Sequence, residues 1–150
     1  MKNLIGITAV TIAMAVSVVL TFCVVRAVVD RVPTAEQSSE VTMGDLLDAI
    51  EWVESKGDSN AIGDGGDAVG AYQIHKIFVR DCNRILGREV HTYTDRLNKI
   101  KSREMAKIYL KYYGGTTEEM VRKFNGGPQG HKKQATLKYW LKIKSRLESK

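Results

Sequence analysis

The feature that most constrains this chain is a dense run of glycine and aspartate directly after an amphipathic helical segment. Between positions 57 and 70 the sequence carries five glycines, with three aspartates among them. Glycine tolerates backbone conformations with positive φ, and aspartate hydrogen-bonds to nearby amides, so the run favours sharp chain reversals. Two apolar pairs, Ala61-Ile62 and Ala68-Val69, flank the segment GDGGD. This arrangement predicts a short, irregular β-hairpin.

A single carboxylate lies near the end of the helix that precedes this run. Leu47, Ile50 and Glu54 are spaced by three and four residues, which places the carboxylate on the same helical stripe as two apolar side chains. Gly57 is expected just beyond the end of the helix. Burial and the negative end of the helix dipole both disfavour an ionised carboxylate there. The pattern predicts that Glu54 is a proton donor near neutral pH, whereas we expect its neighbour Glu51 to be an ordinary solvated side chain.

Apolar spacing predicts a series of helices that end at glycines. The first would begin after the cap residue Thr42, which has Asp45 three residues later to complement it. Trp52 lies off the buried stripe and is expected to pack on a neighbouring helix, with a sugar site as the alternative. The other helices are expected from Ile74 to Gly87, from Thr92 or Thr94 through Tyr112 to Gly114, from Thr117 to Phe124, and across a final segment containing Leu137, Trp140 and Leu141.

Four short motifs follow one another in a distinctive order. They are VES at 53–55, GAYQI at 70–74, FNGGPQG at 124–130 and TLKYW at 136–140. In this order they resemble the invertebrate-type (destabilase) lysozymes and, more loosely, the soluble lytic transglycosylase (SLT) domains, over about residues 46–143. The resemblance implies a fold of the lysozyme-like superfamily, an α+β and predominantly helical domain with one small β-hairpin.

The same resemblance implies a peptidoglycan-degrading glycosidase, a lysozyme that cleaves the β-1,4 bond between N-acetylmuramic acid and N-acetylglucosamine. Glu54 matches the glutamate of the family's VES motif and would protonate the leaving oxygen. Asp64 or Asp67 would assist as nucleophile or electrostatic stabiliser, with Asp64 favoured by its spacing. In the alternative, both aspartates only bind turn amides. A lytic transglycosylase would use Glu54 alone and leave an anhydro-muramic product.

Substrate-binding residues are expected along the cleft of such a domain. Sugar faces stack on aromatic rings and their polar groups need fixed partners, which suits Tyr72, Gln73 and Asn125. In the alternative, Tyr72 packs within the hairpin and Asn125 caps a helix. The resemblance adds to this set the residues Ser55, Gly70 and Gly127.

The amino-terminal segment predicts a membrane anchor. Residues 4–25 form an uncharged, largely apolar run that at ~1.5 Å per residue is long enough to cross a ~30 Å hydrocarbon core. We expect an anchor or signal segment at 1–26, a tether at 27–42 and a catalytic domain at 43–150 on the periplasmic or extracellular side. A cleaved signal peptide, and hence a secreted enzyme, is the alternative.

The cysteines, the histidines and the net charge predict few binding partners besides the glycan. Cys23 and Cys82 are the only cysteines, so the domain has no internal disulfide, and Cys82 is expected in the core. The histidines His75, His91 and His131 lack metal-ligand spacing and are expected at surface or loop positions. We expect a monomer with no cofactor, no metal and no nucleic-acid partner, despite a net charge of +6. A non-catalytic wall-binding protein and a membrane-disrupting protein are the alternatives from other classes.

Overall fold

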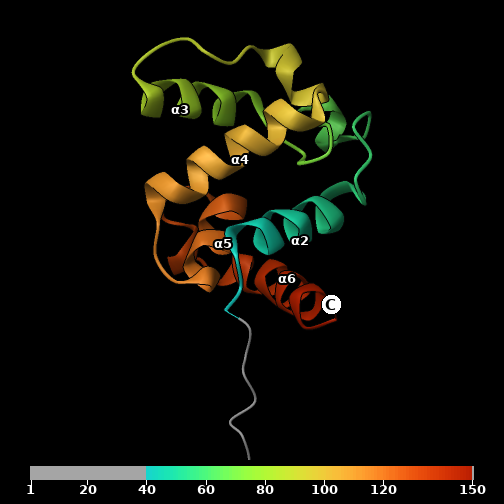
Figure 1. Cartoon of the computed structure of the whole chain (residues 1–150), viewed down its shortest axis with the longest axis vertical. Coiled ribbons are helices and arrows are strands. Elements are labelled where there is room, and N and C mark those ends of the chain that lie inside the picture. The colour runs from blue at the N-terminus through green and yellow to red at the C-terminus, as the bar shows by residue number, and fades with distance from the viewer. Residues whose placement is uncertain (1–39, 150) are drawn as a thin grey trace, which may run out of the picture. The chain divides into compact units, whose positions relative to one another are not determined.

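The computed structural model describes residues 40–149, which form a mainly helical domain with one small hairpin (Figure 1). In chain order the main elements are α2 (Met43–Ser55), β1 (Ile62–Gly63), β2 (Ala68–Val69), α3 (Lys76–Leu86), α4 (Lys99–Tyr113), α5 (Thr117–Gly126) and α6 (Leu137–Glu148). Single 3-10 turns occupy Asp64–Gly66, Tyr93–Leu97, Gly130–Lys132 and Gln134–Thr136. The predicted helical α+β domain with one hairpin is therefore confirmed.

The predicted membrane segment at residues 4–25 lies outside the described residues, as does most of the predicted tether at 27–42. Within residues 40–149, no helix combines the length and the apolar character that a bilayer span requires. The anchor, the tether and the proposed domain boundaries stay predictions.

Local sequence signals set most of the helix ends. The Thr42 hydroxyl accepts a hydrogen bond from the Asp45 amide, and the Asp45 carboxylate accepts one from the Thr42 amide, as predicted for this cap. α2 ends where Lys56 and Gly57 adopt positive φ values of 57° and 87°. The cap of α4 was predicted at Thr92 or Thr94, but Asn98 caps α4, and Thr92 caps only the 3-10 turn before it.

The hairpin forms where the glycine-rich run predicted it, shifted by one residue in its first strand. Ile62 pairs with Val69, and Gly63 pairs with Ala68, in antiparallel register. The chain then turns back, so that Val69 and Ile74 form a further bridge. We call the hairpin together with its bridge to Ile74 the hairpin wall. Ile74 belongs to this wall and not to α3, where its spacing had placed it.

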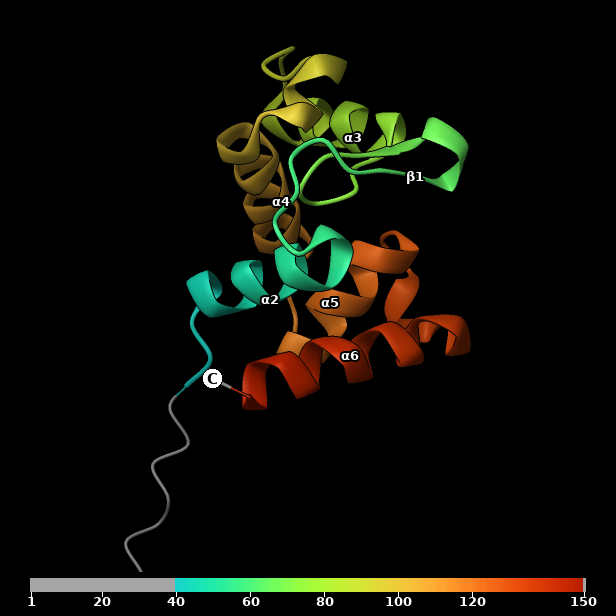
Figure 2. The ribbon, with the colours of Figure 1, turned by 90° about the vertical axis from the view of Figure 1, so that its right-hand side faces the viewer.

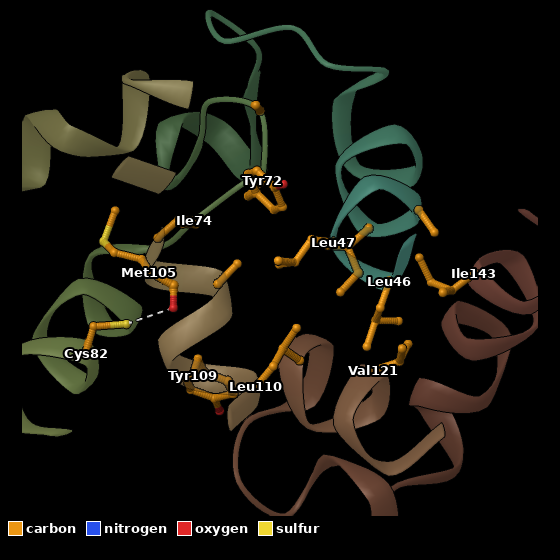
Figure 3. Close-up of a cluster of buried hydrophobic side chains, with 14 of the residues drawn as sticks. Leu46, Leu47, Tyr72, Ile74, Cys82, Met105, Tyr109, Leu110, Val121 and Ile143 are labelled. Carbon is orange, nitrogen blue, oxygen red and sulfur yellow. Dashed lines mark hydrogen bonds between the residues drawn. The ribbon is translucent and has the colours of Figure 1, made fainter. Parts of the chain in front are cut away.

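A single apolar core joins the helices of this domain. Figure 3 shows side chains from α2, α4, α5 and α6 meeting there, among them Leu46, Met105, Val121 and Ile143. Cys82 is fully buried, as predicted, and its thiol lies 3.4 Å from the Met105 carbonyl oxygen.

Helical spacing alone does not fix which side chains are buried. Tyr112 and Leu141 follow the apolar spacing of their helices, yet each is 55% exposed. His91 lies in a loop, one of the two positions expected for it, and is buried there. The buried face of a helix is set by the neighbouring element, which a single-helix spacing pattern does not contain.

The helices α2 and α6 pack side by side and run in opposite directions (Figure 2). This pairing matters for function because it brings the start of α6 to the end of α2. Two residues 85 positions apart in the chain, Glu54 and Tyr139, thereby come into contact.

Candidate active site

Glu54 lies in the last turn of α2 at the wall of the main cavity. Burial raises the pKa of its carboxyl from the ordinary 4.5 to about 7, and the nearby charge of Asp64 adds to this rise. The hydrogen bond from Tyr139 and the charge of Lys142 oppose the rise, and burial outweighs both. Within residues 40–149 Glu54 forms no ion pair. A carboxyl in this state can both donate and accept a proton near neutral pH.

Tyr139 is the residue beside Glu54 to which sequence reasoning assigned no role. Its hydroxyl donates a hydrogen bond to Glu54 Oε1 over 2.6 Å, and burial holds the pKa of the phenol well above its ordinary value. The contact fixes Oε1 of a carboxyl that lines the cavity. The signal that could have found it is the tyrosine of the TLKYW motif, which carried part of the family resemblance.

The cavity at Glu54 has a volume of about 960 Å³ and lies between the hairpin wall and helices α3, α4 and α5. Its apolar surface is largely aromatic: the rings of Phe78 and Tyr109 stack with centroids 4.3 Å apart, and Phe124 meets Phe78 edge to face at 5.3 Å. A cavity of this size with an aromatic wall and a few polar groups suits a ligand of several sugar rings. The lining residues are Glu54, Asp64, Ala68, Gln73, Ile74, His75, Ile77, Phe78, Arg80, Asp81, Arg84, Tyr109, Tyr113, Phe124, Asn125, Gly127 and Pro128.

Asp64 lines the same cavity as Glu54, whereas Asp67 does not. Asp64 begins the 3-10 turn between the strands with a left-handed φ of 47°, and its carboxylate lies 3.2 Å from His75 Nε2. The Asp64 side chain is 72% exposed. Asp67 contributes its main-chain carbonyl, which accepts a hydrogen bond from Arg96. Of the two predicted aspartates, only Asp64 is placed to act at the cavity.

Three of the predicted substrate-binding residues line the cavity. Gln73 has a positive φ of 47°, and its side-chain amide donates to the carbonyls of Ala61 and Gly70, which fixes its position. Asn125 is exposed in the last turn of α5. Gly127 follows with a φ of 82° and open space where a side chain would be. Backbone and amide groups at this end are thus accessible to a ligand.

Tyr72 was predicted to stack on a sugar, and the structure contradicts this. Its side chain is fully buried in the core, where its hydroxyl accepts a hydrogen bond from Arg103 over 2.9 Å. A ring enclosed in this way has no face to offer a ligand. The alternative of a packing role in the hairpin region is the one that fits.

Gly70 and Ser55 hold the site together and do not line the cavity. Gly70 is buried with a φ of 80°, and a side chain there would overlap the Arg96 carbonyl oxygen, so its role is close backbone packing. The Ser55 hydroxyl donates to the Ala71 carbonyl oxygen over 2.8 Å. That bond ties the end of α2 to the GAYQI loop. We correct both predicted substrate contacts to structural roles.

Glu51 was expected to be solvated, yet it is 9% exposed. Its carboxylate forms an ion pair of 2.6 Å with Lys99, and Arg103 lies 4.0 Å away. The carboxylate one turn before Glu54 is therefore held by cations from α4. Sequence spacing alone did not reveal these partners.

The described residues contain no group of three or more histidine, cysteine, aspartate or glutamate side chains that could hold a metal ion. The groups that the structure brings together at the cavity are the carboxyl of Glu54, the phenol of Tyr139, the carboxylate of Asp64, the imidazole of His75 and the amides of Gln73 and Asn125.

Comparison with known proteins places this geometry in a family. Residues 32–147 match the transglycosylase SLT domain. A chain of the crystal structure of Aeromonas hydrophila PliI in complex with Meretrix lusoria lysozyme is similar in fold, with a TM-score of 0.58 and 24% sequence identity, over 70% of this chain and 90% of that chain. No curated protein matches the sequence. The predicted lysozyme-like and SLT relationship is confirmed, and this chain belongs to the transglycosylase SLT domain family.

Proposed function

We propose that this protein cleaves the β-1,4 bond between N-acetylmuramic acid and N-acetylglucosamine in peptidoglycan, by the lytic transglycosylase route, with Glu54 as general acid. The observation that carries the proposal is the state of Glu54: a carboxyl whose pKa is raised to about 7 by burial, at the wall of a large aromatic cavity. Membership of the SLT family supports peptidoglycan as the substrate.

The proposed reaction uses one carboxyl twice. Protonated Glu54 gives its proton to the glycosidic oxygen, the bond from that oxygen to C1 of the muramic acid breaks, and the N-acetylglucosamine part leaves as an alcohol. The C6 hydroxyl of the muramic acid then attacks C1 and gives its proton to the Glu54 carboxylate. The products are the shortened strand and a 1,6-anhydro-muramic end, and no water is consumed. A pKa of about 7 suits both steps.

Tyr139 acts in this scheme as a positioning residue. Its hydrogen bond to Oε1 fixes the carboxyl and stabilises the ionised state that follows proton donation. Gln73 and Asn125 are proposed to bind the polar groups of the sugars. The half-buried rings of Phe78 and Phe124 offer an apolar surface for the sugar rings.

A lysozyme-type hydrolysis is the second candidate, and one observation favours it. Asp64 lines the same cavity and is close enough to Glu54 to raise its pKa. As a nucleophile or stabiliser, Asp64 would allow water to complete the reaction. Two observations speak against this role: the Asp64 side chain is 72% exposed, and its carboxylate contacts His75. The carboxylate is therefore solvated and is not held toward the sugar.

Product analysis on purified sacculi tests the proposal. The full chain should clear a suspension of sacculi, and mass spectrometry should find anhydro-muramic ends as the main product. Glu54→Gln keeps the size and hydrogen bonding of the side chain but has no proton to give, so clearing should fall by about a thousandfold. Clearing by a folded Glu54→Gln protein would refute the proposal.

The variant Asp64→Asn separates the two candidates. In the transglycosylase route it should keep the anhydro product and most of the rate. In the lysozyme route it should lose about a hundredfold or more in rate, and the wild type should release reducing ends that contain one added water. A hydrolysed product from the wild type would move the assignment to a lysozyme while leaving Glu54 as the acid.

We also propose that the domain works outside the cytoplasmic membrane, because peptidoglycan is there, and that residues 4–25 anchor it as a monomer. The reaction needs no cofactor, since protonation and glycosyl transfer use only groups of the enzyme and the sugar. Protease accessibility of the domain in intact cells, compared with cells opened by lysis, tests the orientation.

A further inference from the structure

A second pocket, of about 410 Å³, lies between the end of α2 and the second half of α6. It shares no lining residue with the cavity at Glu54. We call it the Trp52 pocket, and its lining residues are Trp52, Val53, Lys56, Lys142, Ser145, Arg146 and Ser149. The proposed reaction makes no use of it.

The wall of the Trp52 pocket is flat and half exposed. Trp52 is 45% exposed, and the Arg146 guanidinium lies over its ring at 4.5 Å from the ring centroid. Stacking of this kind holds the two planar groups together as one surface.

The charge of the pocket has a single sign. Lys56, Lys142 and Arg146 line it, and no acidic residue does. Within residues 40–149 none of these three side chains forms an ion pair, whereas Lys144 on the same helix has Glu148 at 3.7 Å. Three cations around one hollow create a positive potential that attracts an anionic group.

We propose that the Trp52 pocket is an accessory site that binds a carboxylate-bearing sugar unit of the peptidoglycan strand, outside the catalytic cavity. A sugar ring packs on the flat surface of Trp52 and Arg146, and its carboxylate meets the cations of Lys56 and Lys142. A pocket of this volume is in the range of small-ligand sites. A lipid phosphate would need the cations but not the exposed aromatic surface.

The consequence is attachment to the polymer at two places. Binding at the Trp52 pocket keeps the strand near the cavity between cuts, because the second binding event is then intramolecular. The inference takes peptidoglycan as the polymer from the proposed function, but it does not depend on the chemistry at Glu54.

Co-sedimentation with sacculi tests this inference. The full chain in neutral detergent, carrying Glu54→Gln so that the wall stays intact, is mixed with sacculi freed of attached phosphate polymers. Adding the double substitution Lys56→Gln/Lys142→Gln to this protein should weaken its affinity for sacculi by about fivefold. The matched control is Lys107→Gln/Lys111→Gln, which removes two exposed charges from α4 and should leave the affinity nearly unchanged. Arg146→Gln should add to the loss, and the difference from the control should shrink at high salt.

Several outcomes would overturn the inference. If both double variants weaken the affinity for sacculi equally, net charge alone matters. If neither weakens it, the pocket is not used.

A second experiment adds phosphatidylglycerol to the micelles and follows Trp52 fluorescence in a Trp140→Phe background. If the pocket variant loses this lipid response but keeps its sacculus affinity, the pocket is a lipid site and not a glycan site. A wild-type chain that binds sacculi through the pocket but does not cleave them would refute only the proposed function.

Discussion

Glu51 and Glu54 are one helical turn apart on α2, and their surroundings differ in kind. Glu51 is buried against α4, where Lys99 lies 2.6 Å from its carboxylate. Glu54 is turned toward α6 and the cavity, where its contact is the neutral hydroxyl of Tyr139. Burial removes water from both carboxyls, but only one of them has a cation in place of that water.

The difference shows how one helix carries a structural carboxylate and a candidate catalytic one. A carboxylate beside a cation forms an ion pair that holds two helices together. A carboxyl buried beside a phenol keeps its proton to a higher pH, which is what a general acid needs. The neighbouring helix, and not the local sequence of α2, decides which of the two states results.

The largest effect expected from this comparison is on the pH dependence of stability. Because the pKa of Glu54 is about 7 in the folded protein and near 4.5 when solvated, its contribution to stability is complete below pH 4.5. It is lost as the pH rises through 7, by about 3 kcal/mol in the free energy of unfolding. Chemical unfolding of the full chain between pH 4 and 8 measures this loss. Glu54→Gln should lack it, and identical pH curves for the two proteins would contradict the account.

The second largest effect concerns Glu51, the structural carboxylate of α2. Glu51→Gln removes the negative charge opposite Lys99 and should lower the free energy of unfolding by about 1–2 kcal/mol, since Lys99 is half-exposed and can still reach water. Turnover of sacculi should stay within about twofold of wild type, because Glu51 does not line the cavity. A large loss of turnover in a stable Glu51→Gln protein would remove the distinction between the two carboxylates.

The smallest effect expected is that of Tyr139→Phe. Its hydrogen bond lowers the pKa of Glu54, so removing the hydroxyl should raise that pKa and move the alkaline limb of the rate profile to higher pH. The maximal rate should fall by about tenfold, because the carboxyl is no longer held in one orientation. A lower rate with an unmoved pH profile would mean that Tyr139 only packs.

Local signals explain what could be predicted from the sequence. The cap at Thr42, the hairpin around Asp64, and the glycines that end α3 and α4 all act within a few residues of themselves. The placement of Glu54 on an apolar stripe near a helix end is also local. The fold class and the central carboxyl were therefore available from spacing and motif order.

The remaining features depend on contacts between distant segments. The hydrogen bond from Tyr139 joins residues 85 positions apart, and the pairing of Glu51 with Lys99 depends on how α4 crosses α2. The buried Tyr72 likewise accepts a hydrogen bond from Arg103, which reaches its hydroxyl from α4. Helical spacing reports which side chains share a face, but not which helix will cover that face.

A direct titration of Glu54 tests the central claim most closely. Carbon-13 NMR of the glutamate carboxyl groups follows each residue with pH, and the spectrum of Glu54→Gln identifies the signal of Glu54. The account predicts a midpoint at about pH 7, shifted upward in Tyr139→Phe. A midpoint near 4.5 would mean that Glu54 is ionised at neutral pH, and it would contradict the assignment of this residue as the proton donor.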